Sequence, residues 1–78
     1  MKALFIQATR TAEFLLECSP HGQLECMDTA LREGHARMLS GDGSYRIIWH
    51  GVEAQGETEG ELVENWITMA LRHTGEAA

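Results

Sequence analysis

Basic residues are scarce in this chain, and they are missing from most of its C-terminal half. The sequence of 78 residues has 6 lysines and arginines against 12 aspartates and glutamates, a formal net charge of −6, and no basic residue lies between Arg46 and Arg72. Proteins bind nucleic acids and anionic membranes through clustered lysine and arginine, so this surface would be repelled. We therefore expect no direct nucleic-acid binding and no membrane binding.

Long apolar runs are lacking as well. Near the N-terminus the longest run covers residues 3–6, which is far shorter than the core of a signal peptide or a membrane-spanning helix. There are only two cysteines, Cys18 and Cys26, and isolated thiol pairs are usually free and partly buried in a reducing compartment. The expected location is therefore the cytoplasm, with both thiols free.

Motifs that would indicate catalysis are also absent. The sequence has no G-x-S-x-G nucleophile motif, and the pair Gly41 and Gly43 is too short for a phosphate-binding loop, which needs a further glycine and a lysine. A chain of this length has little room for a nucleophile, an oxyanion hole and a substrate pocket together. We expect neither enzymatic activity nor a cofactor.

The overall composition is typical of a globular protein. Hydrophobic residues make up 44% of the chain and charged residues 23%, which argues against disorder. Residues 1–78 are therefore expected to form a single small domain. A domain of this length buries only about 60–65% of the surface that its unfolded chain exposes, so association with a partner or with a second copy would add to a small margin of stability.

Hydrophobic periodicity predicts two helices in the N-terminal half. In residues 2–17 one helical face collects Leu4, Phe5, Ala8, Ala12, Leu15 and Leu16. The first part of this segment, residues 3–8, is also compatible with a strand. Ser19 as N-cap and Pro20 in the first turn predict the start of a second helix. Apolar residues then recur at helical spacing, so this helix is expected to run from Pro20 to about Leu39.

A change of period predicts a strand after residues 40–43, where two glycines around Asp42 favour a turn. Large side chains then alternate, with one face formed by Tyr45, Ile47 and Trp49 and the other by Arg46, Ile48 and His50. His50 and Gly51 should turn the chain back through residues 52–55 as a short hairpin. The strand's mate is open among this hairpin, the N-terminal segment and another subunit.

The C-terminal helix has the clearest start signal. Thr58 as N-cap and Glu61 at the third helical position form a capping box, and one face of the following segment is apolar, with Leu62, Val63, Trp66, Ile67 and Ala70. The helix should end near His73, before Gly75. The expected fold class is α+β, mostly helical, in the order helix, helix, strand, strand, helix.

The cysteines and histidines raise the question of a metal site. Cys18, His21, Cys26 and His35 are all zinc-ligand types, but their spacing fits no standard zinc module, and a helix in this region would place Cys26 opposite His35. We expect no metal site, with His35 packed at the edge of the helix and His50 exposed on the sheet. A small metal or redox module that uses Cys18, His21 and Cys26 is the alternative.

The acidic stretch indicates the class of partner. Residues 53–78 carry six glutamates against one arginine, and such a surface attracts basic protein surfaces. Glu59 and Glu61 are explained by the dipole at the predicted helix N-terminus. Three carboxylates have no basic neighbour in the sequence and are the candidate partner-binding residues: Glu53, Glu57 and Glu64.

Two aromatic residues complete the predicted binding surface. Tyrosine and tryptophan are enriched at protein-binding hot spots. A domain this small could need Tyr45, Trp49 and Trp66 all in its core, but if any is exposed it should be Tyr45 or Trp49, whereas Trp66 belongs to the buried face of the last helix. We therefore hypothesise a small acidic non-catalytic protein-binding module, an inhibitor or adaptor that docks on a basic surface, such as one that itself binds nucleic acid. Small acidic proteins of phages and mobile elements often act in this way, a comparison that rests on size and charge alone.

A homo-oligomeric structural subunit is a further alternative. In that arrangement the strand of residues 45–50 pairs with its copy across a two-fold axis, which makes the protein a homodimer.

Overall fold

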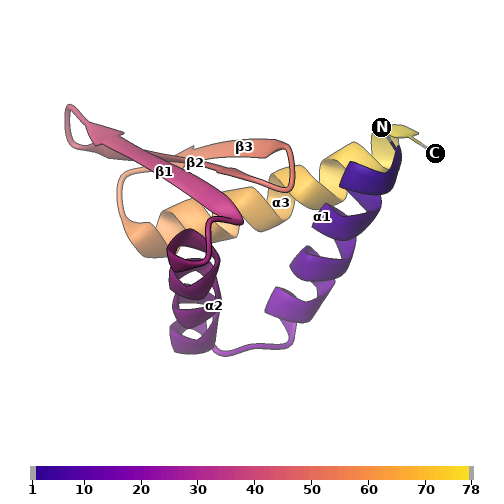
Figure 1. Ribbon diagram of the computed structural model, residues 1–78, viewed down its shortest axis with the longest axis horizontal. Helices are drawn as coiled ribbons and strands as arrows, with labels where there is room; N and C mark the ends of the chain where they lie inside the picture. The colour runs from indigo at the N-terminus through magenta and orange to yellow at the C-terminus, as the bar shows by residue number, and fades with distance from the viewer. Residues whose placement is uncertain (1, 78) are drawn as a thin grey trace.

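The structure, a computed structural model, describes the backbone of residues 2–77 and the side chains of residues 6–72. Its elements are α1 (Lys2–Leu16), α2 (Pro20–Arg32), β1 (Ala36–Gly41), β2 (Ser44–Trp49), β3 (Val52–Gly56) and α3 (Glu59–Ala77). α3 runs beneath the sheet, α1 packs against α3, and α2 lies below the start of β1 (Figure 1). The fold class is α+β, as predicted, with an antiparallel sheet in the order β1-β2-β3.

Two tight turns of the same kind set the strand order. Asp42 and Gly43 have φ values of 54° and 77°, and His50 and Gly51 have φ values of 53° and 78°. Positive φ at both loop residues matches the right-handed twist of the flanking strands, so each turn joins adjacent antiparallel strands. The predicted turns at residues 40–43 and 50–51 are both confirmed, and β2 therefore has a mate on each side.

The second helix is shorter than predicted. α2 ends at Arg32 rather than near Leu39, because Gly34 takes a φ of 82°, a conformation that glycine adopts without steric cost. The His35 N–H donates to the Ala30 carbonyl at 2.8 Å, which closes the helix end as in a Schellman motif.

A strand that the sequence did not predict replaces the last part of that helix. Met38 lies about two helical turns after Leu31, and this spacing extended the predicted helix. In the structure Met38 instead lies on the same face of β1 as the buried Ala36, and the exposed Arg37 between them lies on the other face. Residues 36–39 fit both the helical and the strand period, and the positive φ of Gly34 ends the helix before them.

The other two helices differ from expectation only at their ends. α1 is a helix throughout Lys2–Leu16, so the strand alternative for residues 3–8 is wrong. α3 continues to Ala77, past the predicted end near His73. The side chain of His73 lies outside the described residues.

The N-terminus of α3 is held by the predicted capping residues Thr58 and Glu61, although the Glu61 carboxylate bonds the N–H of Glu57 rather than that of the N-cap. The Glu61 N–H donates to Thr58 Oγ1 at 3.1 Å, and Glu61 Oε1 accepts from the backbone N–H of Glu57, also at 3.1 Å. The end of β3 lies directly against this first turn, since a Cβ atom on Gly56 would be 2.6 Å from the Leu62 nitrogen. The strand and the helix start are therefore fixed relative to each other.

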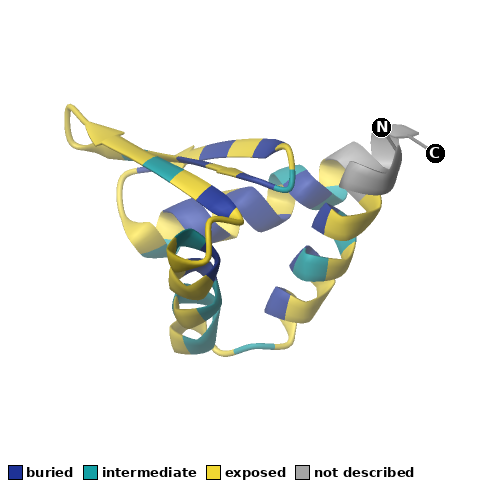
Figure 2. Cartoon of the chain, viewed as in Figure 1, coloured by how far each residue is buried: buried dark blue, intermediate teal, exposed yellow. Residues whose placement is uncertain are grey.

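The buried core lies between the sheet and α3 and continues between α3 and α1 (Figure 2). It is formed by Ile47, Trp49, Val52 and Ala54 from the sheet, Leu62, Val63, Trp66, Ile67 and Ala70 from α3, Ala8, Ala12 and Leu15 from α1, Met27 and Ala30 from α2, and Ala36 from β1. Trp66 is fully buried, as predicted, and its Nε1–H donates to the carbonyls of Trp49 and Val52 at 3.1 Å each. Within the described side chains, no buried nitrogen or oxygen lacks a hydrogen-bond partner.

The contact at Gly56 predicts a large effect of one added methyl group. The Gly56→Ala variant should lose about 1–3 kcal/mol of unfolding free energy, because its Cβ would clash with the backbone of Leu62 and force β3 away from α3. The matched control is Gly41→Ala, where an added Cβ meets nothing within 4 Å and the change should stay within about 0.5 kcal/mol. Urea unfolding followed by circular dichroism measures both. Equal losses in the two variants would contradict the proposed close contact.

Candidate functional site

The predicted partner-binding residues do not form one surface. Trp49 is only 4% exposed and belongs to the core, so of the two candidate exposed aromatic residues it is not the exposed one. Tyr45 is half-buried, and Glu53, Glu57 and Glu64 are exposed.

Glu53 has a basic neighbour that the sequence alone does not reveal. Glu53 Oε2 lies 3.0 Å from Arg46 Nε on the outer face of the sheet, and the register that brings them together pairs Arg46 with Gln55. The Gln55 amide, oriented with its oxygen toward Arg46, accepts from Nε at 3.2 Å and from the terminal nitrogen at 3.0 Å. Both charged side chains are about half exposed, so the pair adds little stability, but it cancels the charge of Glu53.

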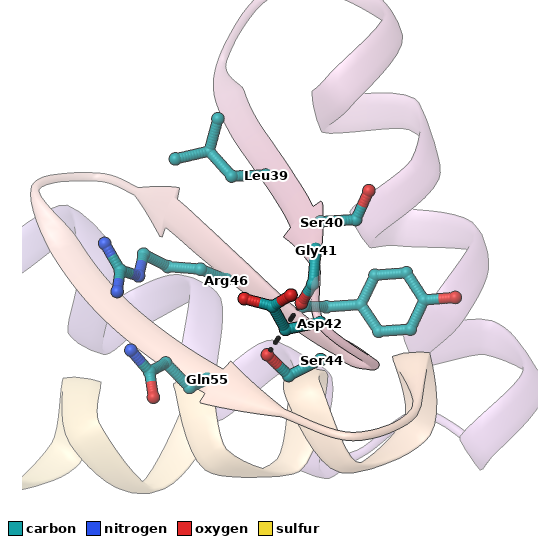
Figure 3. Close-up of a pocket in the computed structure, with 8 residues that line it drawn as sticks. Leu39, Ser40, Gly41, Asp42, Ser44, Arg46 and Gln55 are labelled. Atoms are coloured by element: carbon teal, nitrogen blue, oxygen red, sulfur yellow. Dashed lines mark hydrogen bonds between the residues drawn. The ribbon is translucent and has the colours of Figure 1, made fainter.

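The β1–β2 hairpin extends beyond the helices, and a hollow of about 230 Å³ lies at its outer part. Figure 3 shows Leu39 of β1 and Arg46 of β2 bordering this hollow, with Gln55 of β3 beside Arg46. The turn contributes Gly41 and Asp42, and the Ser44 hydroxyl donates to the Gly41 carbonyl at 3.3 Å. The hollow therefore combines an apolar side chain, a tyrosine, one cation that is already paired, and a turn carboxylate that forms no ion pair with the side chains of residues 6–72.

A second hollow joins two of the predicted residues. Glu57 and Tyr45 both line a space of about 250 Å³, together with the hairpin residues Ser40, Gly41, Gly43 and Ser44. Tyr45 borders both hollows. The capping hydrogen bond to the Glu57 backbone fixes the chain at this point, so a tyrosine and a carboxylate lie near the hairpin on a rigid support.

The start of α3 carries carboxylates with no countercharge of their own. Glu61 is engaged in the capping box. Among the side chains that the structure describes, none of the ion pairs includes Glu57, Glu59 or Glu64. Their charges therefore remain available to an external cation.

The predicted alternative metal ligands do not assemble. His21 is paired with Glu25 at 3.2 Å on the exposed side of α2. His35 is 63% exposed and lies 3.6 Å from Glu33, so its predicted packing is wrong, because α2 ends before it. Between residues 6 and 72, no three histidine, cysteine, aspartate or glutamate side chains converge as metal ligands would.

The two cysteines are free and half-buried, as predicted. They line one hollow on α2 together with Gly22, Glu25 and Thr29. Burial, followed by the effect of the nearby Cys18 thiol, raises the pKa of the Cys26 thiol above its ordinary value of 9.0. The neutral thiol is therefore the dominant form of Cys26 at neutral pH.

His50 is a structural residue that the sequence did not reveal. It was expected to be exposed, but its ring is stacked on Trp49 with centroids 5.9 Å apart, and its Nε2 is hydrogen-bonded to Thr11 Oγ1 at 3.1 Å. Burial, followed by the charge of nearby His35, lowers the pKa of His50 below its ordinary value of 6.5. Nothing in the sequence connects Thr11 with His50, so only the tertiary arrangement shows that this turn is joined to α1.

Comparison with known proteins adds no relative: no family model, no curated protein and no solved structure matches this chain. Among the described residues, no helix has both the length and the apolar character needed to cross a membrane.

The lowered pKa of His50 predicts that acid destabilises the fold. Below about pH 6.5 the unfolded state binds a proton at this histidine more readily than the native state does, so the unfolding free energy falls as the pH decreases. The His50→Asn variant, with a residue that tolerates positive φ, should show a smaller loss of urea midpoint between about pH 7.5 and about pH 5.5. His21→Asn is the control, since His21 is exposed, and it should keep the wild-type pH dependence. An unchanged pH dependence in His50→Asn would refute this role.

Proposed function

We propose that this chain is a small, acidic, non-catalytic protein-binding module, an inhibitor or adaptor that docks on a basic surface of a larger protein in the cytoplasm. The observation that carries the proposal is the set of exposed carboxylates at the start of α3, Glu57, Glu59 and Glu64, which have no ion-pair partner among the described side chains. Glu53 is left out of the docking surface because Arg46 already neutralises it.

The geometry around Glu57 supports this choice of surface. Tyr45 lines the same hollow as Glu57, and a tyrosine beside a carboxylate offers apolar contact area together with charge recognition. The capping box fixes the backbone at Glu57 and Glu61, so binding would cost little ordering of the main chain. Charge of one sign on a rigid surface speeds encounter with a basic partner and makes the affinity depend on salt.

The test is a pair of double charge reversals. Full-length protein and the variants Glu57→Lys/Glu64→Lys and Glu13→Lys/Glu17→Lys are immobilised and exposed to extract from the source cell. Glu13 in α1 and Glu17 immediately after it are exposed near the N-terminal end of the chain, so the second variant has the same net charge with the proposed surface intact. The retained proteins are then identified and titrated individually.

A partner that fits the proposal binds the wild type and the α1 variant equally. It should lose at least about tenfold in affinity for Glu57→Lys/Glu64→Lys, and its affinity for wild type should fall as salt rises from about 50 mM to about 300 mM. Binding that tolerates both the reversal and the salt would show that the contact lies elsewhere.

A further inference from the structure

The sheet has two outer edges, formed by β1 and β3, and the edge of β1 is the more open of the two. β2 is paired on both sides, so the strand of residues 45–50 has no free backbone groups and cannot join a second subunit as considered above. On the outer edge of β3 the Gln55 carbonyl is already engaged, because Asn65 Nδ2 of α3 donates to it at 2.6 Å, and Thr68 and Met69 of α3 line a hollow beside this edge. Figure 2 shows β1, in contrast, exposed along most of its length.

The register identifies the open backbone groups of β1. Gly41 and Ser44 close a two-residue hairpin, and the closing pair of such a hairpin is hydrogen-bonded. Hydrogen-bonded pairs alternate along an antiparallel ladder, so Leu39 and Arg37 also point their backbone groups toward β2. The N–H and C=O groups of Met38 and Ser40 therefore point outward, away from the sheet.

This edge has few of the features that usually prevent strand pairing. Proteins protect exposed edges with proline, charged side chains (especially lysine), bulges or a covering segment. β1 contains no proline, its only charged residue is Arg37, and its register with β2 has no bulge. Beside the edge, Leu39 is 58% exposed on the outer face of the sheet. The edge thus offers unsatisfied hydrogen bonds and an apolar side chain to another strand.

We propose that the occupant of this edge is β1 of a second copy of the chain, paired antiparallel across a two-fold axis at Leu39. The two three-stranded sheets would then form one continuous sheet. In this register Met38 of each copy lies opposite Ser40 of the other and exchanges the outward hydrogen bonds. Leu39 lies opposite its own copy in a non-hydrogen-bonded pair, where side chains approach most closely.

Charge complementarity favours the same register. Arg37 lies opposite Gly41 of the second copy, and the glycine leaves space for the guanidinium to reach the adjoining Asp42. Both Arg37 and Asp42 are exposed, and within the described part of the chain neither takes part in an ion pair. Because of the two-fold symmetry, the Arg37–Asp42 ion pair would form twice, once on each side of the axis.

The dependence of affinity on salt concentration distinguishes this dimer from the docking on a basic partner proposed above. Each copy carries a net charge of −6, so two copies repel each other over distance. The two Arg37–Asp42 pairs across the axis are exposed and contribute little, so salt that screens the net repulsion should strengthen the dimer. Docking on a basic partner should weaken with salt. The dimer does not depend on the proposed function, and each can fail without the other.

The first test is sedimentation velocity of the full chain as a function of concentration, with two matched variants. Leu39→Lys places two like charges opposite each other on the axis and should raise the dimer dissociation constant at least about tenfold. Ile48→Lys adds the same charge to the same face but on the central strand β2, beside Arg37, and it should weaken the dimer far less than Leu39→Lys does. A wild type that stays monomeric up to about 1 mM, or equal effects of the two variants, would overturn the proposal.

A second test uses disulfide crosslinking to determine which residues face each other across the two-fold axis. In a Cys18→Ser/Cys26→Ser background, Leu39→Cys should form a disulfide-linked dimer under mild oxidation, since the two-fold axis brings the two thiols together. Ile48→Cys on the same face should stay monomeric. Ser40→Pro removes an outward N–H, a change that an edge strand tolerates, and it should abolish the dimer while circular dichroism reports an intact fold. Crosslinking at residue 48 as fast as at residue 39 would contradict the two-fold pairing.

Discussion

The arrangement of the whole chain depends on one indole N–H. Trp66 donates it to the carbonyls of Trp49 and Val52, the two residues that close the β2–β3 hairpin. The Trp66 ring also stacks on the Trp49 ring with centroids 4.5 Å apart, so a single side chain fixes both the distance and the direction of the hairpin relative to α3. The close approach of β3 to α3 at Gly56 and the projection of the first hairpin follow from this placement.

Local signals in the sequence predicted local structure well. The capping residues Thr58 and Glu61, the two turns and the buried face that contains Trp66 could all be read from neighbouring residues, because their chemistry is decided within a few positions. β1 was missed because its apolar residues fit a helical period as well as a strand period. The discriminating signal was Gly34, whose positive φ ends α2.

The candidate site was less predictable because it depends on contacts between distant segments. Glu53 has its countercharge in Arg46 only through the register of β2 and β3, and Trp49 is covered only because α3 lies under its strand. Tertiary pairing thus removed one glutamate and one tryptophan from the predicted surface. It also added an arrangement that composition did not indicate, with Tyr45 and Glu57 bordering one hollow near the projecting hairpin.

The hydrogen bond from Asn65 to Gln55 has a consequence for how far the sheet can grow. A sheet with two open edges can add copies at both ends and polymerise into fibres. Here Asn65 of α3 engages the Gln55 carbonyl on the β3 edge, so a strand that adds to this edge would first have to break that hydrogen bond. Pairing through β1 uses the same strand of each copy and is therefore isologous, and this asparagine opposes further growth at the other edge while it links helix and strand.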